Sequence, residues 1–300
     1  MKKLALALAA VLACGVATVA TAADTLAKIK SAGKIAIGTR DSSAPLAYTT
    51  GDGKYVGYHV DVCLKIAEAI KANLKAPSMP IEYTVVTSAN RVPLVQNGTV
   101  DMECGSTTNN AARQAQVAFA PTTFVTNVRT AVKASSGITS IEQLNGKTVA
   151  TTTGTTSVQL LRKHERAKNV DIKELMGKDH SDSFLLLESG RADAFVMDGQ
   201  ILAGNIAKSK APADFKIVGD ALSVEPIACM LRKDDPAFLK AVDDSIKRQI
   251  ADGSLAKLYD KWFMQPIPPT NTKVGLPLSE ATKAAWANPN NKPMEDYVKK

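Results

Sequence analysis

The chain has 300 residues, of which 45% are hydrophobic, 5% aromatic and 22% charged, and its formal net charge is +8. So few aromatic residues argue against the base-stacking surfaces of proteins that bind single-stranded nucleic acid, and the basic residues form no long run. We therefore expect no nucleic-acid partner. A chain of this length is expected to form two units of ordinary domain size.

The first 22 residues have the pattern of a secretory signal peptide. Lys2 and Lys3 precede an apolar run over residues 4–19, and the small residues that follow it provide a cleavage site before Ala23 or Asp24. We therefore expect an exported protein, with lipid attachment at Cys14 as the alternative. No later stretch approaches the roughly eighteen apolar residues of a membrane-spanning helix.

Strands alternate with helices in the first part of the mature chain. The predicted strands span residues 34–40, 81–86 and 100–104, and the first predicted helix spans residues 58–74. A second, short helix has Ser88 or Asn90 as its cap and is closed by Asn97-Gly98. This β-α-β-α-β order is typical of a parallel sheet. Arg40 ends the first strand, and open α/β sheets bind ligands at the carboxyl ends of their strands.

The third predicted strand leads into a turn that is rich in hydroxyl and amide side chains. Residues 106–110 read Ser-Thr-Thr-Asn-Asn, and Arg113 lies one turn into the helix that follows. Such residues cap helix N-termini, where free N–H groups and the positive end of the helix dipole attract anions. The stretch predicts a carboxylate-binding turn, with an ordinary turn and a solvated arginine as the alternative.

A second unit of similar architecture follows Pro121. Its predicted strands span residues 128–134, 147–151, 170–175 and 191–198, and its predicted helices span residues 140–143, 158–168 and 182–189. Extended segments near residues 124–127 and 224–226 would link the two units, and two packed helices follow before a Pro- and Asn-rich tail. Two lobes joined by two strands predict a hinge, with the ligand in the cleft.

Three cysteines remain after the signal peptide, and export would bring them into an oxidising compartment. Cys63 lies on the apolar face of the helix predicted at residues 58–74, so we expect a buried thiol. Cys104 and Cys229 each lie in a strand-like segment. A disulfide between them is the expectation, and two buried thiols are the alternative.

Several motifs, in their order and spacing, resemble the periplasmic solute-binding proteins that serve amino-acid ABC importers. The resemblance covers residues 24–268. Its carriers are Gly98-Thr-Val-Asp101 before Ser106-Thr-Thr-Asn-Asn110, Leu144-Asn-Gly-Lys147 before Thr153-Gly-Thr-Thr156, Leu187-Glu-Ser-Gly-Arg-Ala-Asp-Ala194, Met230-Leu-Arg-Lys-Asp-Asp235, and Asp252-Gly253 with Lys261-Trp-Phe263. Details at residues 39–43, 87–93, 103–110 and 178–180 resemble the branch that binds glutamate and aspartate.

The resemblance implies an α/β fold of the periplasmic binding protein-like type II, in which two lobes are joined by two hinge strands around a ligand cleft. Residues 23–125 and 226–268 would form lobe 1, residues 126–225 lobe 2, and residues 269–300 a C-terminal tail. It also implies a periplasmic, monomeric binding protein without a cofactor, which closes on glutamate or aspartate and docks on an inner-membrane permease with its ATPase.

By the same resemblance, Arg113 with Ser106, Thr108 and Thr156 would hold the α-carboxylate of the ligand. Asp198 would hold its α-ammonium. The residues that would face the ligand side chain are Arg40, Ser88, Arg91 and His180, and Thr153 would be a further contact from lobe 2. Where the family often flanks the ligand with aromatic rings, the loop after Arg40 has Leu46, with Tyr48 nearby.

Three arginines against one aspartate give this cleft a charge of about +2, whereas glutamate carries a net charge of −1. Because a buried charge without a partner costs several kcal/mol, the cleft should reject neutral glutamine and cationic lysine.

Two other functions stay open at this point. An exported dehydratase or lyase would need an acid or base at the ligand, and His180 is the one candidate. A ligand sensor would use the same closure. His59, His164 and His180 share no metal-ligand spacing, and we expect the first two to be solvated helix residues.

Overall fold

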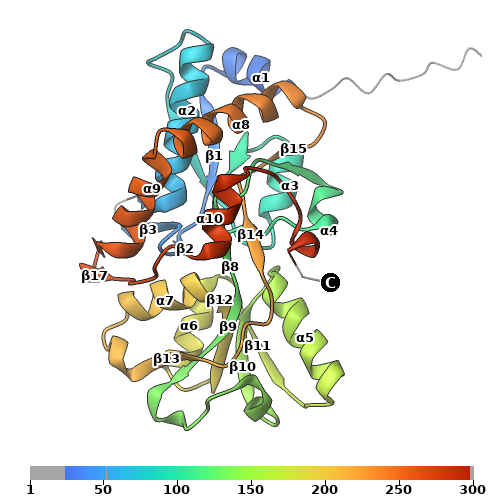
Figure 1. The fold of residues 1–300 in the computed structure, drawn as a ribbon, viewed down its shortest axis with the longest axis vertical. Coiled ribbons are helices and arrows are strands. Elements are labelled where there is room, and N and C mark those ends of the chain that lie inside the picture. Colours follow the sequence, from blue (N-terminus) through green and yellow to red (C-terminus); the bar gives the residue numbers. More distant parts are fainter. Residues whose placement is uncertain (1–23, 52, 298–300) are drawn as a thin grey trace, which may run out of the picture.

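The computed structural model describes residues 24–51 and 53–297. The chain folds into two α/β lobes, one above the other in Figure 1, and each lobe is built on a five-stranded sheet. Lobe 1 has the strand order β5-β1-β6-β15-β7, and lobe 2 has the order β11-β10-β12-β9-β13. The predicted two-lobed α/β fold is therefore confirmed. The predicted signal peptide and Cys14 lie outside the described residues.

The sheet of lobe 1 is mixed, because β5, β1 and β6 run parallel while β15 runs antiparallel to β6 and β7. Its strands are β1 (Ile35–Thr39), β5 (Ile81–Val85), β6 (Met102–Glu103), β7 (Val117–Phe119) and β15 (Met230–Arg232). Its helices are α1 (Thr25–Ala32), α2 (Tyr58–Asn73), α3 (Arg91–Gln96), α4 (Ala111–Gln114), α8 (Pro236–Ala251) and α9 (Ser254–Tyr259). A small sheet of β2 (Ser42–Ser43), β3 (Ala47–Gly51) and β4 (Lys54–Val56) follows β1.

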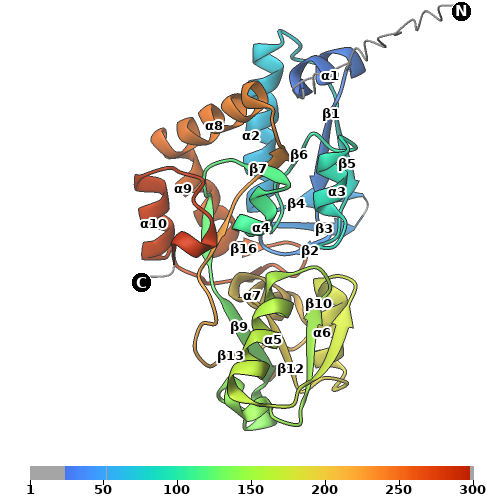
Figure 2. The same cartoon turned by 90° about the vertical axis from the view of Figure 1, so that its right-hand side faces the viewer.

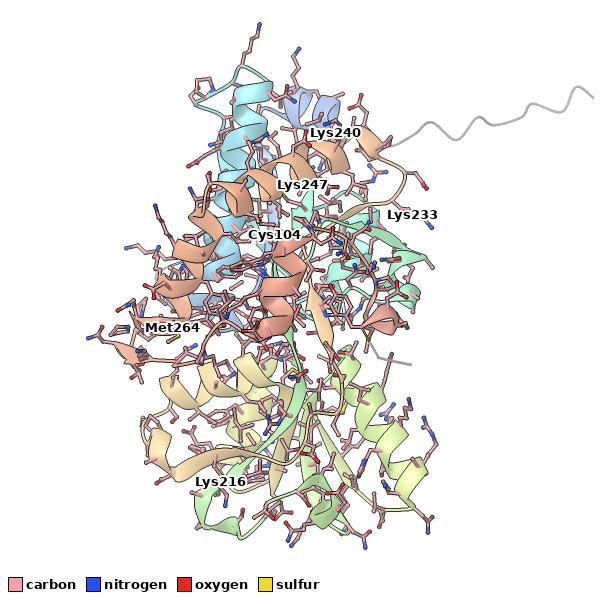
Figure 3. The ribbon with its side chains drawn as sticks, in the orientation of Figure 1. Cys104, Lys216, Lys233, Lys240, Lys247 and Met264 are labelled. Carbon is pink, nitrogen blue, oxygen red and sulfur yellow. A yellow bond between two sulfur atoms is a disulfide. The ribbon has the colours of Figure 1, made fainter. Side chains whose placement is uncertain are left out.

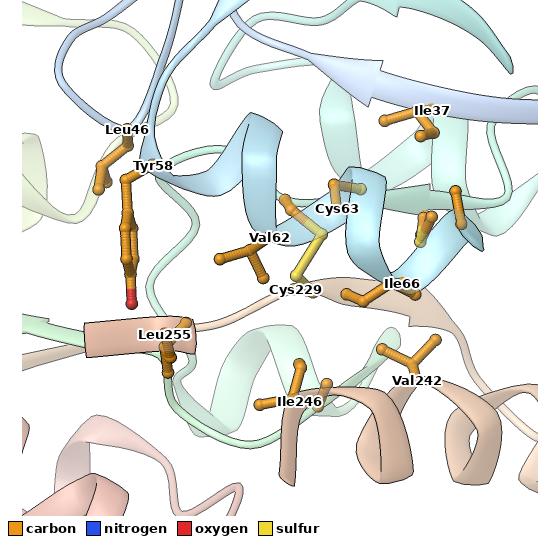
Figure 4. Close-up of a cluster of buried hydrophobic side chains, with 14 of the residues drawn as sticks. Ile37, Leu46, Tyr58, Val62, Cys63, Ile66, Cys229, Val242, Ile246 and Leu255 are labelled. Atoms are coloured by element: carbon orange, nitrogen blue, oxygen red, sulfur yellow. A yellow bond between two sulfur atoms is a disulfide. The ribbon is translucent and has the colours of Figure 1, made fainter. Parts of the chain in front are cut away.

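The core of lobe 1 forms where the apolar face of α2 meets that of α8. Apolar residues recur along both helices at helical spacing, so each helix buries one continuous stripe. Figure 4 shows Val62 and Ile66 of α2 on the side of Val242 and Ile246 of α8, with Cys63 toward Ile37. The thiol of Cys63 is free and buried. A disulfide joins Cys104, directly after β6, to Cys229, directly before β15, so it links two neighbouring strands of the sheet.

Lobe 2 repeats this architecture without repeating the sequence. Its strands are β9 (Val128–Lys133), β10 (Thr148–Thr152), β11 (Lys173–Gly177), β12 (Ala194–Asp198) and β13 (Phe215–Val218). Its helices are α5 (Thr156–Lys168), α6 (His180–Glu188) and α7 (Gly199–Lys208). The parallel strands β10, β11 and β12 point their carboxyl ends at lobe 1 (Figure 2), and a capping box at Ser140 opens a short 3-10 helix at Ile141–Leu144.

Two antiparallel strands cross between the lobes (Figure 1), β8 (Phe124–Thr126) and β14 (Glu225–Ile227), and Glu225 pairs with Thr126. They coincide with the two linking segments expected near residues 124–127 and 224–226. The residue limits predicted for each lobe stay a prediction.

The C-terminal tail covers one side of this crossing. After the hairpin of β16 (Pro266–Ile267) and β17 (Thr272–Lys273), helix α10 (Glu280–Ala287) packs against β8 (Figure 1). The indole N–H of Trp286 donates to the carbonyl of Thr123 at 2.9 Å, and the hydroxyl of Thr282 accepts from the N–H of Val125 at 3.1 Å. The tail is therefore a structural part of the hinge.

Basic side chains are divided between the two lobes. Figure 3 labels Lys233, Lys240 and Lys247 on the outside of lobe 1 and Lys216 on lobe 2. Within the described residues, no helix combines the length and the apolar character that crossing a bilayer requires.

Candidate ligand-binding site

A narrow cavity lies between the lobes, with an empty volume of about 180 Å³. The lining residues are Ser88, Arg91, Ser106 and Thr108 from lobe 1, and Thr155, Thr156, His180, Met197 and Asp198 from lobe 2. Seven of these nine are residues that the sequence predicted for the site.

Most of these residues follow the carboxyl end of a strand. Ser106 and Thr108 follow β6, Thr156 begins α5 after β10, and His180 begins α6 after β11. Asp198 is the last residue of β12. Side chains that follow neighbouring parallel strands meet at one sheet edge, so the two sheets present their ligand-binding edges to each other.

Arg40 is fully buried and joins both lobes. Its Nη1 donates to the hydroxyl of Ser106 at 3.0 Å and its Nη2 donates to that of Ser88 at 3.0 Å. The same Nη2 lies 3.3 Å from Nε2 of His180. Burial, and then the charge of Arg91, lower the pKa of Arg40 to about 10, so it still carries its charge at neutral pH.

Arg91 is only 2% exposed, and its Nε and Nη1 have no hydrogen-bond partner among the described residues. Burial lowers its pKa. A buried guanidinium with unsatisfied donors is costly by several kcal/mol unless a carboxylate completes it. Because Arg91 lines the cavity, the carboxylate would come from a ligand.

Arg113 spans the cleft from the start of α4. Its Nη1 donates to the carbonyl of Thr108 at 2.8 Å, and its Nη2 donates to that of Gly154 in lobe 2 at 3.4 Å. Burial, and then Arg91, lower its pKa to about 9. The side chain of Asn110 accepts from the N–H of Arg113 at 2.8 Å, as the predicted helix cap requires.

Asp198 is the carboxylate on the lobe 2 side of the cavity and is 4% exposed. Nε2 of Gln200 donates to it at 3.3 Å. Burial, and then the negative charge of Glu225, raise the pKa of Asp198 to about 7. A cationic partner beside it would favour its charged form.

Two buried carboxylates make the predicted charge of about +2 wrong. Glu225 accepts from the hydroxyls of Thr108 and Thr156, and Glu103 accepts from that of Thr107 at 2.5 Å. Both carboxylates lie near Arg91 and Arg113. Their negative charge partly offsets the lowering of the two arginine pKa values by burial. The three arginines are thus matched by three carboxylates, Asp198, Glu103 and Glu225. Glu103 could have been found, because it alternates with the apolar residues of its strand; Glu225 had no comparable signal.

Thr153 is exposed and does not line the cavity. Thr155 takes that place, and its hydroxyl donates to the carbonyl of Thr152 at 2.7 Å. The loop residues Leu46 and Tyr48 are buried within lobe 1 and do not line the cavity either, and the hydroxyl of Tyr48 donates to the carbonyl of Pro268 at 2.7 Å.

The expectation that His59 is solvated is wrong, because it is 0% exposed. Its Nδ1 lies 2.5 Å from the carbonyl of Gly105, and its Nε2 lies 2.8 Å from the hydroxyl of Thr123. Burial lowers its pKa to about 4. The first turn of α2 lies between the turn that contains Gly105 and the segment that enters the hinge at Thr123. His59 is therefore buried and connects these two segments by hydrogen bonds.

The lobes touch directly around the cavity, so the structure is a closed arrangement. A Cβ atom added to Gly154 of lobe 2 would lie 2.7 Å from Cα of Ala89 in lobe 1. One added to Gly204 would lie 2.2 Å from the carbonyl oxygen of Ala44. Glycine is needed at both positions because backbones approach this closely.

No group of three or more His, Cys, Asp or Glu side chains in the described part of the chain could hold a metal ion. The arrangement of this site, with arginines on one side and a carboxylate on the other, suits a small molecule that carries both carboxylate and ammonium groups.

Comparisons with known proteins agree with this geometry. The model of the bacterial extracellular solute-binding proteins, family 3, matches residues 35–265. The L-glutamate/L-aspartate-binding protein of Pseudomonas aeruginosa is 47% identical over 272 residues, 90% of each chain. The glutamate/aspartate import solute-binding protein of Escherichia coli is 46% identical over 289 residues, 96% of each chain. A solved solute receptor for L-cysteine from Neisseria gonorrhoeae is 28% identical with a TM-score of 0.71, over 80% of this chain and 94% of that one.

Proposed function

The chain belongs to family 3 of the bacterial extracellular solute-binding proteins, and on that premise we propose that it captures glutamate or aspartate between its lobes for import by an ABC transporter. It is a binding protein and not an enzyme, because the family and its close relatives are transport proteins. The lyase alternative therefore falls away.

The observation that carries the ligand assignment is the pair of buried arginines, Arg40 and Arg91. Nε and Nη1 of Arg91 lack partners among the described residues, while Arg40 is held in place by Ser88 and Ser106. A side-chain carboxylate between the two guanidiniums would satisfy these donors. A neutral amide has one acceptor oxygen and an N–H₂ group that only donates, so glutamine would leave part of these arginine donors unsatisfied.

The other ends of the ligand have their own partners in this proposal. Arg113 holds the α-carboxylate at the start of α5, and Ser106, Thr108 and Thr156 line the cavity there. Asp198 holds the α-ammonium. His180 supports the side-chain end through Arg40. Thr153 has no direct role here, because it is exposed and does not line the cavity.

Closure delivers the ligand in a form that the transporter can select. Binding contributes contacts from both lobes, so it favours the closed arrangement over an open one. We propose that the closed protein docks, as a monomer, on an inner-membrane permease with its ATPase. We also propose that residues 1–22 direct its export to the periplasm and are removed, with lipid attachment at Cys14 as the alternative.

Isothermal titration calorimetry tests the proposal. The protein is unfolded and refolded to remove carried-over ligand, and then titrated separately with glutamate, aspartate, glutamine and histidine. Binding of the two acids alone, with a Kd of about 1 μM or tighter, is expected. Equal binding of glutamine or histidine would contradict the ligand assignment.

A further inference from the structure

Glu225 is a buried charge that the proposed function does not use. It is the first residue of hinge strand β14 and is 0% exposed. Its Oε2 accepts from Oγ1 of Thr108 at 2.5 Å and from Oγ1 of Thr156 at 2.8 Å. Its Oε1 accepts from the hydroxyl of Ser223 at 3.2 Å.

This contact fixes the direction of two hydroxyl groups in the cavity. A threonine hydroxyl has one hydrogen to donate and lone pairs that accept. Thr108 and Thr156 lie 3.5 Å apart, but a carboxylate is the stronger acceptor, so both hydrogens go to Glu225. Each hydroxyl then offers only lone pairs to a ligand. Lone pairs suit an ammonium group and not a carboxylate.

Asp198 lines the same cavity as these two hydroxyls, and Glu225 is close enough to raise its pKa. An ammonium group beside Asp198 could therefore donate one hydrogen to the carboxylate and others to the hydroxyl oxygens. An ammonium has three hydrogens to place, and a single carboxylate does not satisfy all of them.

We infer that Glu225 is a positioning residue, which turns the hydroxyls of Thr108 and Thr156 into acceptors for the α-ammonium of the ligand. The inference rests on the proposed function and refines it. Thr108 and Thr156 then contribute hydroxyl oxygens to the ammonium, and the α-carboxylate relies on Arg113 and on the free N–H groups at the start of α5.

The same contact joins the three parts of the molecule that move during closure. Thr108 belongs to lobe 1, Thr156 to lobe 2 and Glu225 to the hinge. The full acceptor set for the ammonium exists only when the lobes meet, so recognition of an α-amino acid and closure depend on one carboxylate.

The test compares L-glutamate with glutarate, which is glutamate without its α-amino group. Both affinities are measured by calorimetry, with glutarate titrated in competition against glutamate where its binding is weak. In Glu225→Gln, the amide N–H₂ that takes the place of Oε2 donates to both hydroxyls and turns their hydrogens toward the ligand. We expect the affinity for glutamate to fall about tenfold to a hundredfold and that for glutarate to change less than about threefold.

Matched variants separate positioning from folding. Ser223→Ala removes the partner of Oε1 without touching either threonine, and should leave the ratio of the two affinities unchanged. If Glu225→Gln fails to fold, Thr156→Val and Thr156→Ser replace it. The valine variant should lower the ratio of the glutamate affinity to the glutarate affinity, and the serine variant should restore that ratio.

The outcomes distinguish a failure of the role of Glu225 from a failure of the proposed function. Equal losses for glutamate and glutarate, or no loss for either, would overturn the role of Glu225 while the proposed function stands. Failure of the unmodified protein to bind glutamate would instead overturn the proposed function itself.

Discussion

Nη2 of Arg40 in lobe 1 lies 3.3 Å from Nε2 of His180 in lobe 2. An arginine can only donate, so Nε2 of His180 accepts, and its Nδ1 carries the hydrogen that faces the hydroxyl of Thr152 at 3.0 Å. Burial, followed by the charges of Arg40 and Arg91, holds the pKa of His180 well below its usual range. The imidazole is therefore neutral at physiological pH and supports the arginine as an acceptor.

Acid should weaken the folded protein through His180. Its pKa is lowered in the folded state, so the unfolded chain takes up a proton first as the pH falls below about 6.5. Stability should then fall by at most about 1.4 kcal/mol per pH unit from this group. The measurement is Tm between pH 7.5 and 5 for the unmodified protein and His180→Gln, whose amide oxygen still accepts from Arg40. The variant should show the shallower dependence; equal slopes would contradict the neutral buried imidazole.

Ligand binding should release a proton near neutral pH. The pKa of Asp198 is raised to about 7 by burial and then by Glu225, so part of the population holds a proton there that the α-ammonium must displace. Below pH 7 the affinity for glutamate should weaken by up to about tenfold per unit, because the carboxyl is increasingly protonated.

Calorimetry in two buffers with different ionisation enthalpies measures this proton release directly. Asp198→Asn should bind more weakly and show no such release. Unchanged release in the variant would assign the proton to another group.

Removing Arg91 should abolish the preference for an acid over its amide. Arg91→Met is expected to cost about 2–5 kcal/mol of glutamate binding and to affect glutamine much less. Because the side chain has unsatisfied buried donors, the variant without ligand should be as stable as the unmodified protein or more so. Calorimetry and Tm measure the two effects.

Arg162→Ala is the matched control, because Arg162 pairs with Glu174 on the surface of lobe 2. It should leave binding unchanged. If Arg91→Met still preferred glutamate over glutamine, Arg91 would not be the residue that binds the side-chain carboxylate of the ligand.

Closure should depend on the absence of a side chain at Gly154. Its φ is +81° and an added Cβ would meet the backbone of Ala89 at 2.7 Å, so Gly154→Ala should weaken glutamate binding by at least about tenfold. Gly146→Ala is the control: its φ is +71°, but nothing lies within 4 Å of an added Cβ. Both variants should lose stability from backbone strain, and only the first should lose affinity. Similar affinities for the two would argue against this contact.

The sequence predicted the site residues whose positions follow from the strand in which they lie or which they follow. Arg40 and Ser106 follow strands of the lobe 1 sheet and Asp198 ends a strand of the lobe 2 sheet, so each lies at the carboxyl edge that its predicted strand indicates. The burial of Glu225, Glu103 and His59 depends on segments that are far apart in the chain. Thr108 and Glu225, which share a hydrogen bond, are separated by 117 residues. Periodicity reports which face of an element is apolar, and it does not report which polar side chain another segment will enclose.

The same limit explains Thr153 and Thr155. Both lie in one hydroxyl-rich turn, and the motif alone gave no reason to choose between them. The path of the turn into α5 points Thr155 inward and leaves Thr153 exposed.

A crystal structure of the protein with L-glutamate tests the central claim most directly. We expect the side-chain carboxylate to lie within hydrogen-bond distance of Nε or Nη1 of Arg91 and of the guanidinium of Arg40, with the ammonium at Asp198. A ligand bound in the opposite sense, with its α-carboxylate at Arg91 and its side-chain carboxylate at Arg113, would contradict it.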